Sequence, residues 1–374
     1  MRGQVNCQQP LFVTLSLEEM VPADHPMRAI KRQCDAVFSE MRRDFNDAYS
    51  RYGRPGIPPE QLLKALLLQA LYSIRSEIQL MQAIRFNLLY RWFLDLGLDE
   101  DVWTPEVFSM NRQRFEQHRL LQKFFDRIVA TALQAGLVSG DHFTVDGTLI
   151  QSWASLKSLK PKNDSQPAPT KGDDDPGNPT VNFHGQKRGN ATHVSTTDGE
   201  ARLARKGSGK EAKLCHSGHV LMENRNGLCL AVNVDAADGR AERRAAEQLL
   251  RHVRHRHRLT PMTLGTDAGY DDGMFLRELE RGGITPHTPV REGPIRATDE
   301  AGQARRRARH RMKRPGYAIS QRIRKRVEEI FGWLKTVAGM ARTRFVGRWK
   351  IGQELLAGGA AYNLLRLTRL RPAA

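Results

Sequence analysis

Three carboxylates stand where they could work together on a phosphate ester. Asp146 and Asp267 each follow a short apolar stretch, so both are expected at strand ends. Glu328 lies in the stretch RKRVEEIFGWLK, 324–335, whose apolar residues recur at helical spacing. Carboxylates from two strands and a helix can hold two divalent ions about 3.5–4 Å apart for in-line attack on a phosphodiester. Such oxygen ligands suit Mg²⁺, whose retained waters can supply the nucleophile.

Each carboxylate also has a simpler interpretation. Asp146 and the glycine after it could form a turn. Asp267 could help to cap a helix that begins near Asp271 and Asp272. Glu328 could form an ion pair with Arg324, four residues earlier on the same helix.

Helical geometry places the adjacent residues Glu328 and Glu329 on different sides of the 324–335 helix. With Arg324 at zero, Glu328 falls at about 40° and Lys335 at about 20°, beside the apolar stripe. Glu329 falls at about 140°, on the side expected to face solvent. Only Glu328 is therefore expected to take part in a site.

Positive charge is concentrated late in the chain. The 374 residues carry a net charge of +18, and residues 301–374 hold 19 Lys and Arg against three acids. The tract 305–326 has eleven basic residues and no acid, as expected of a phosphate-binding surface. The alternative is a disordered basic tail, but helical spacing resumes directly after the tract. A nucleic-acid partner is favoured.

A second basic stretch, ARTRFVGRWK at 341–350, interleaves charges with aromatic residues. Arg344 and Arg348, beside Phe345 and Trp349, suit contacts to a nucleic-acid backbone together with stacking. A basic rim around core aromatic residues is the alternative.

Composition excludes several classes of protein. Forty percent hydrophobic residues in 374 fit a globular protein with room for two domains. The longest apolar run, 62–74, is interrupted and too short to span a bilayer, and the start has no signal segment, so we expect a cytoplasmic protein. The four cysteines lack metal-ligand spacing and indicate reduced thiols. Three histidines, His252, His255 and His257, are interpreted as one basic helix face.

The periodicity changes near residue 139. Helical patterns at 58–74, 104–118 and 120–137 predict an all-helical region, 1–138, that binds DNA. Its short helices either include a helix-turn-helix or show this pattern only because they pack against one another. Later segments alternate between strand and helix patterns, with a hairpin turn at Asn226–Gly227: strands at 141–151, 213–237, 261–267 and 284–290, helices at 240–258 and 274–283. This order predicts a mixed sheet with helices on its faces. The Pro-, Asp- and Gly-rich segment 155–200 is expected to be a mobile insertion, cut first by proteases at 160–180.

The motifs together resemble a known family. The segments VDGT at 145–148, LGTDAGYDD at 264–272 and RKRVEEIFGWLK resemble a DDE transposase of the bacterial insertion sequence five family. The last segment is similar to that family's R-x3-E-x6-K signature through Arg324, Glu328 and Lys335. The likeness covers about residues 45–370. Where the fuller signature has tyrosine this chain has Gln321, and Tyr317 lies one turn earlier.

The resemblance implies an RNase H-like mixed sheet flanked by helices, residues 139–374, after the helical region. It implies that Asp146, Asp267 and Glu328 bind two Mg²⁺ ions, replaceable by Mn²⁺. Basic residues would bind DNA phosphates: Arg322, Arg324, Lys325, Arg326, Lys335, Arg344 and Arg348. The implied activity is hydrolysis at the terminal inverted repeats of a mobile element and strand transfer into target DNA, by a homodimer in the bacterial nucleoid. A metal-dependent nuclease without strand transfer and a non-catalytic DNA-binding regulator are the alternatives.

Overall fold

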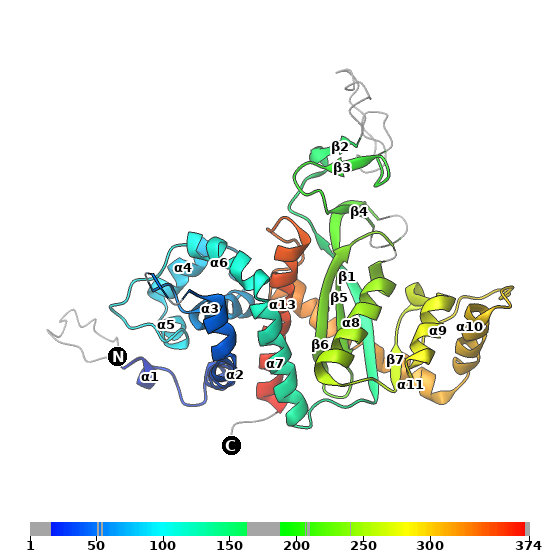
Figure 1. The fold of residues 1–374 in the computed structure, drawn as a ribbon, viewed down its shortest axis with the longest axis horizontal. Coiled ribbons are helices and arrows are strands. Elements are labelled where there is room, and N and C mark those ends of the chain that lie inside the picture. Colours follow the sequence, from blue (N-terminus) through cyan, green and yellow to red (C-terminus); the bar gives the residue numbers. More distant parts are fainter. Residues whose placement is uncertain are drawn as a thin grey trace, which may run out of the picture.

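The first half of the chain is a cluster of helices. The computed structural model describes residues 16–50, 52–53, 55–162, 188–205, 207, 210–239 and 241–370. The predicted helices at 58–74, 104–118 and 120–137 are confirmed, and Ser76 and Asn87 cap two shorter ones through their side chains. The cluster lies to one side of the molecule (Figure 1) and consists of α1 (Leu17–Met20), α2 (Pro26–Ala48), α3 (Pro59–Leu71), α4 (Glu77–Phe86), α5 (Leu88–Phe93), α6 (Glu106–Gln117) and α7 (Leu120–Gln134).

The second half is built on a mixed sheet. Its central strands run in the order β6–β5–β1–β7–β8, with β5 antiparallel to both β1 and β6, while β7 and β8 continue parallel to β1. This order and these directions are those of an RNase H-like sheet, so the predicted fold is confirmed. The strands are β1 (His142–Gln151), β4 (Arg202–Ala204), β5 (Lys213–Glu223), β6 (Leu228–Ala236), β7 (Thr263–Gly265) and β8 (Thr285–His287).

Helices cover both faces of the sheet. α8 (Ala241–His257) packs on β1, β5 and β6, while α12 (Val327–Thr336) packs on β1 and α13 (Arg348–Leu370) packs on β6. α9 (Gly273–Arg281), α10 (Glu300–Arg311) and α11 (Pro315–Arg324) lie beyond β7, where a separate small core joins α9 to α10. The sheet edge near β7 and β8 is therefore enclosed by the basic segment of the chain.

α13 connects the two halves. It packs on α3 and α7 on one side and on β6 on the other, and stands between them in Figure 1. Gly359 permits the close approach, because a Cβ there would lie 3.0 Å from Phe125 and 3.5 Å from Val232. One continuous hydrophobic core consequently runs from the helical cluster into the sheet.

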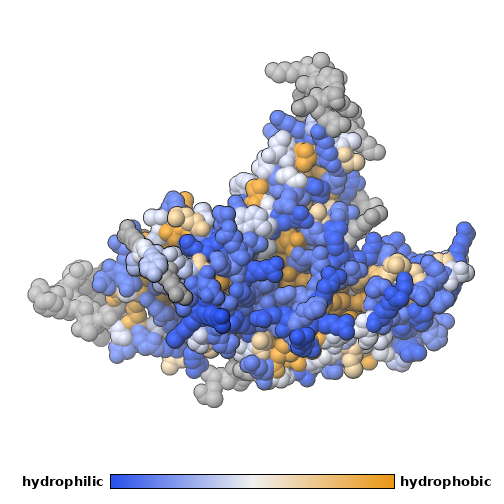
Figure 2. Space-filling view, viewed as in Figure 1, coloured by the Kyte–Doolittle hydropathy of each residue, from blue (hydrophilic) through white to orange (hydrophobic). Residues whose placement is uncertain are grey.

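A narrow arm rises from the sheet end (Figures 1 and 2). It carries β2 (Leu159–Pro161) paired with β3 (His193–Ser195), preceded by a 3₁₀ turn at Leu156–Ser158. The expected insertion, 155–200, is therefore ordered at both ends, because Leu159 packs with Ala154, Ala201 and Leu214 in a small core. Its middle, 163–187, lies outside the described residues, as does most of the expected protease-sensitive stretch.

The remaining composition-based expectations concern membranes and thiols. Among the described residues, no helix has both the length and the apolar character needed to cross a membrane. Cys34, Cys215 and Cys229 are buried free thiols, in agreement with the sequence, and Cys7 lies outside the described part of the chain.

Candidate active site

The sheet brings Asp146 and Asp267 side by side. In the parallel pairing of β1 and β7, Thr144 lies opposite Gly265, so two residues further along Asp146 lies level with Asp267. Asp146 lies two residues beyond Thr144, and Asp267 lies two residues beyond Gly265. Side chains two residues apart on a strand lie on the same face, so Asp146 and Asp267 share one face of the sheet. Two aspartates that are 121 residues apart in the sequence thus lie on neighbouring strands.

Asp146 is not at the end of its strand. The ladder with β5 continues through Asp146, opposite Val220, as far as Gln151, because β5 is longer than β7. This corrects the expectation of a strand end and excludes the turn interpretation. Asp267 does cap a turn, since its Oδ1 accepts a hydrogen bond from the Gly269 amide at 2.8 Å at the start of the 3₁₀ turn Ala268–Tyr270.

The carboxylates repel one another. The pKa of Asp146 is raised to about 6, first by burial and then by the charges of Asp267 and Glu328, while the hydrogen bond from the Gly147 amide and the charge of Arg324 oppose the shift. Glu328 is exposed at the start of α12, close enough to Asp146 for its charge to act there. Carboxylates whose charges act on one another supply the oxygen donors that divalent cations prefer.

Arg324 contacts the site directly. Its Nη1 lies 3.3 Å from Asp146 Oδ2, so the expected ion pair between Arg324 and Glu328 does not form. The reason is a break in the helix: α11 ends at Arg324 and α12 begins at Val327. Arg326 holds the break by donating to the carbonyl oxygens of Asn224 and Arg225 in the β5–β6 turn.

Gln321 orients this arginine. Its amide donates to the carbonyl oxygens of His287 at 2.6 Å and Thr266 at 3.3 Å, which ties α11 to the ends of β7 and β8. Its Oε1 accepts from Arg324 Nε at 3.3 Å. Tyr317 packs edge-on against His287, with ring centroids 6.0 Å apart. Gln321 thus has a defined structural role at the position where the family signature has tyrosine.

Glu329 points away from Asp146. Its Oε2 lies 3.2 Å from Arg366 Nη1 on α13, and its side chain is 55% exposed. The predicted difference between Glu328 and Glu329 therefore has a structural basis, although Glu329 has a partner instead of facing solvent alone.

The other basic candidates fall into two groups. Arg322 and Lys325 are exposed, and in the described part of the chain nothing pairs with them. Arg344 lies 3.5 Å from Glu77, and Arg348 lies 2.7 Å from Glu200 and 3.2 Å from Asp235. The ion pairs of these two arginines connect the 341–350 segment to α4 and to the sheet.

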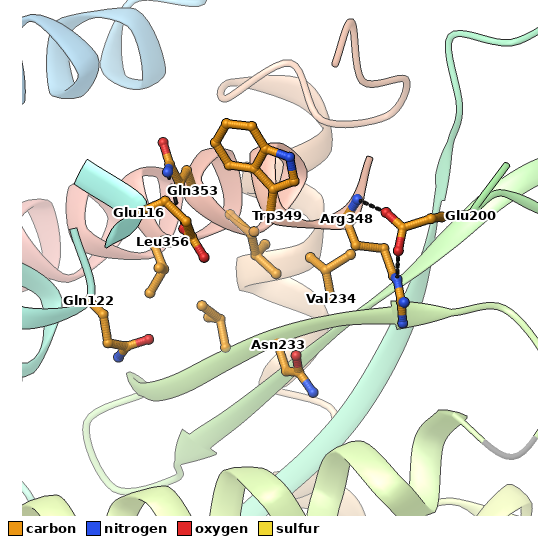
Figure 3. Close-up of a pocket in the computed structure, with 12 residues that line it drawn as sticks. Glu116, Gln122, Glu200, Asn233, Val234, Arg348, Trp349, Gln353 and Leu356 are labelled. Atoms are coloured by element: carbon orange, nitrogen blue, oxygen red, sulfur yellow. Dashed lines mark hydrogen bonds and ion pairs between the residues drawn. The ribbon is translucent and has the colours of Figure 1, made fainter. Parts of the chain in front are cut away.

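Two cavities adjoin these basic residues. Lys335, Arg75, Arg342 and Trp153 line one of about 640 Å³ between α3 and α12. Figure 3 shows another, of about 430 Å³, in which Arg348 reaches Glu200 and Trp349 lies over the space beside α13. Asp146, Asp267 and Glu328 line neither cavity.

The histidines of α8 differ from the expectation. His252 Nε2 lies 2.9 Å and His257 Nε2 3.9 Å from Oδ1 of the buried Asp126, so these two are not simply a basic helix face. Arg256 approaches the other oxygen at 3.4 Å and supplies a positive charge there. The pattern of His residues alone could not reveal Asp126, which comes from α7.

Glu242 was not identified from the sequence. It lies in the first turn of α8, where a carboxylate among many charges looks like part of a solvated face. In the structure it borders Asp267, because a Cβ on Gly269 would lie 2.7 Å from Glu242 Oε2 and 3.0 Å from Asp267 Oδ1. Only the fold of α8 onto β1 and β5 brings it there.

Comparison with known proteins gives two family matches. Residues 15–114 match a model described as Transposase domain (DUF772), and residues 164–364, more than half of the chain, match Transposase DDE domain. The second match contains Asp267 and Glu328 and begins after Asp146. No curated protein matches the chain. A solved structure, piggyBac transposase in a synaptic complex with hairpin DNA, aligns over 92% of this chain and 72% of its own, with 9% identity and a TM-score of 0.39.

Proposed function

The chain belongs to the family of transposases with a DDE domain, and from this premise we propose that Asp146, Asp267 and Glu328 are the carboxylates of its catalytic centre. The electrostatic influence of Asp267 and Glu328 on Asp146, with the two aspartates on adjacent strands, is the observation that carries the proposal. DNA transposition is the activity of the family. The R-x3-E-x6-K pattern in 324–335 supports a place in the insertion sequence five group.

The chain's own residues divide the work. Asp146 and Asp267, fixed by adjacent strands, would hold two Mg²⁺ ions, and Glu328 would complete the ligand set from α12. The ions would activate the attacking water or 3′-hydroxyl and stabilise the leaving oxygen. Arg324, oriented by Gln321, lies beside Asp146 and would neutralise a phosphate that enters the site.

The substrate that we propose is the one that membership of this family implies. The ends of a mobile element would be cut first, and the released 3′-hydroxyl would then attack target DNA. A homodimer would hold the two ends together. Joining of a precut end to a second duplex, measured by gel electrophoresis, separates this function from that of a nuclease, which cuts without joining.

Two adjacent glutamates provide the test of the site. Glu328→Gln keeps the shape but removes the charge that a divalent ion needs, so cleavage should fall by about two orders of magnitude or more while DNA binding persists. Glu329→Gln, the matched control, loses only an exposed ion pair with Arg366, worth about 0–1 kcal/mol, and should retain most cleavage. Cleavage is measured at equal protein and Mg²⁺ concentrations. Two active variants, or a dead Glu329→Gln with an active Glu328→Gln, would contradict the proposed site.

A further inference from the structure

A fourth carboxylate lies against the proposed centre. The distances from the Cβ position of Gly269, 2.7 Å to Glu242 Oε2 and 3.0 Å to Asp267 Oδ1, place these two oxygens within about 6 Å of each other. Glu242 comes from α8, on an element that supplies none of the three carboxylates named above. The absence of a side chain at Gly269 gives Glu242 access to Asp267.

The strand beneath Glu242 also makes room for it. A Cβ on Gly147, the residue after Asp146, would lie 3.6 Å from Glu242 Cγ and 2.9 Å from His219 Nδ1. His219 is fully buried, and neither of its ring nitrogens has a hydrogen-bond partner among the described residues. Two glycines, Gly147 on β1 next to Asp146 and Gly269 in the turn after Asp267, thus shape the space that Glu242 occupies.

A buried hydroxyl nearby lacks a partner. Tyr270 is 0% exposed, and its Oη makes no hydrogen bond to any described residue. Burial raises the pKa of Tyr270 well above its usual range, and the charges that add to the shift are, in order, Glu242, Asp146 and Asp267. The hydroxyl of Tyr270 is thus a buried, unpartnered polar group on which the charges of all three carboxylates act.

We infer that Glu242 is a fourth carboxylate of the cation site and holds a divalent ion together with Asp267. This inference rests on the proposed function, because it adds a ligand to the same centre. The simpler role of Glu242 is to stabilise the N-terminal turn of α8, where an acid is favoured by the helix dipole. That role explains its place on α8 but not its position against Asp267, where like charges repel.

Mn²⁺ binding to the full-length protein without DNA tests the inference. Calorimetric titration should show Mn²⁺ affinity about tenfold weaker in Glu242→Gln than in wild type, and the Mg²⁺ concentration for half-maximal cleavage should rise by a similar factor. Glu247→Gln is the matched control, because Glu247 lies on the same helix but is exposed and lines a cavity between α8 and α9. Glu242→Asp keeps the charge and should bind Mn²⁺ more tightly than Glu242→Gln.

The outcomes distinguish this inference from the proposed function. Wild-type Mn²⁺ affinity in Glu242→Gln, together with much weaker binding in Asp267→Asn, would overturn the role of Glu242 and leave the three-carboxylate centre intact. Unchanged Mn²⁺ binding in Asp146→Asn and Asp267→Asn as well would overturn both. Circular dichroism checks that α8 is retained. If Glu242→Gln is unfolded, weaker Mn²⁺ binding in Glu242→Asp than in Glu247→Gln supports the inference, and equal binding overturns it.

Discussion

At the residue scale, Asp146 carries an electrostatic cost when no cation is bound. Its pKa in the folded protein, about 6, lies above the ordinary value of 3.8, because it is buried beside Asp267 and Glu328. A folded-state pKa above the unfolded value gives stability that is present at low pH and falls away as pH rises through about 6. At pH 7.5 the cost is on the order of 3 kcal/mol, at about 1.4 kcal/mol per pKa unit.

Asp146→Asn should therefore stabilise the cation-free protein at neutral pH. Thermal unfolding in the presence of a chelator should show a higher Tm than wild type at pH 7.5 and nearly the same Tm at pH 4. Adding Mg²⁺ at pH 7.5 should raise the wild-type Tm and narrow the gap, because the cation removes the repulsion. A variant that is destabilised equally at both pH values would show that Asp146 contributes mainly through its hydrogen bond to the Gly147 amide.

At the element scale, the basic tract 305–326 is only partly a surface. Arg305 forms a two-bonded pair with Asp271, which is 1% exposed, and Arg307 and Arg311 both pair with Glu280. These arginines hold α10 against α9. The exposed cations without a partner in the described part of the tract are Lys313, Arg314, Arg322 and Lys325.

Salt dependence should separate the two groups. Replacing Lys313, Arg314, Arg322 and Lys325 with Gln should flatten the slope of log K against log salt for unrelated duplex DNA, by about 0.9 for each phosphate that the protein no longer neutralises. Replacing Arg307 and Arg311 with Gln should instead lower stability and leave the slope nearly unchanged. Fluorescence anisotropy across a salt series measures the slope. An unchanged slope in the first variant would remove these four residues from the DNA interface.

The sequence predicts the features that depend on local periodicity, but not those that depend on contacts between residues far apart in the chain. Alternating apolar residues predicted β1, the Asn226–Gly227 turn predicted β5 and β6, and a short apolar stretch predicted β7. Asp146 and Asp267 were identified with these strands. The break between Arg324 and Glu328 could not be predicted, because Arg326 bonds to a turn about a hundred residues earlier in the chain. Glu242 was missed for the same reason. Its neighbours on α8 are charged, and only the fold reveals that this one faces Asp267.

At the scale of the whole molecule, α13 makes the helical cluster and the sheet depend on each other. Gly359→Val should place new atoms against Phe125 and Val232 and cost about 1–3 kcal/mol, as overpacking typically does. Hydrogen exchange with mass spectrometry should show faster exchange in both α3 and β6. Gly352→Val on the same helix is the control, since a Cβ there meets nothing within 4 Å. Faster exchange in only one of the two halves would show that they are stabilised independently.

The position of α13 also determines the order in which the protein can complete its folding. α13 contacts α3, and nearly three hundred residues separate the two helices in the chain. During synthesis the helical cluster and most of the sheet emerge from the ribosome before the helix that lies between them. Until α13 docks, the apolar surfaces of α7 and β6 that it covers are exposed, and such surfaces favour aggregation. Contacts of this sequence separation also slow folding, so the newly made chain keeps part of its apolar surface exposed until α13 joins the helical cluster to the sheet.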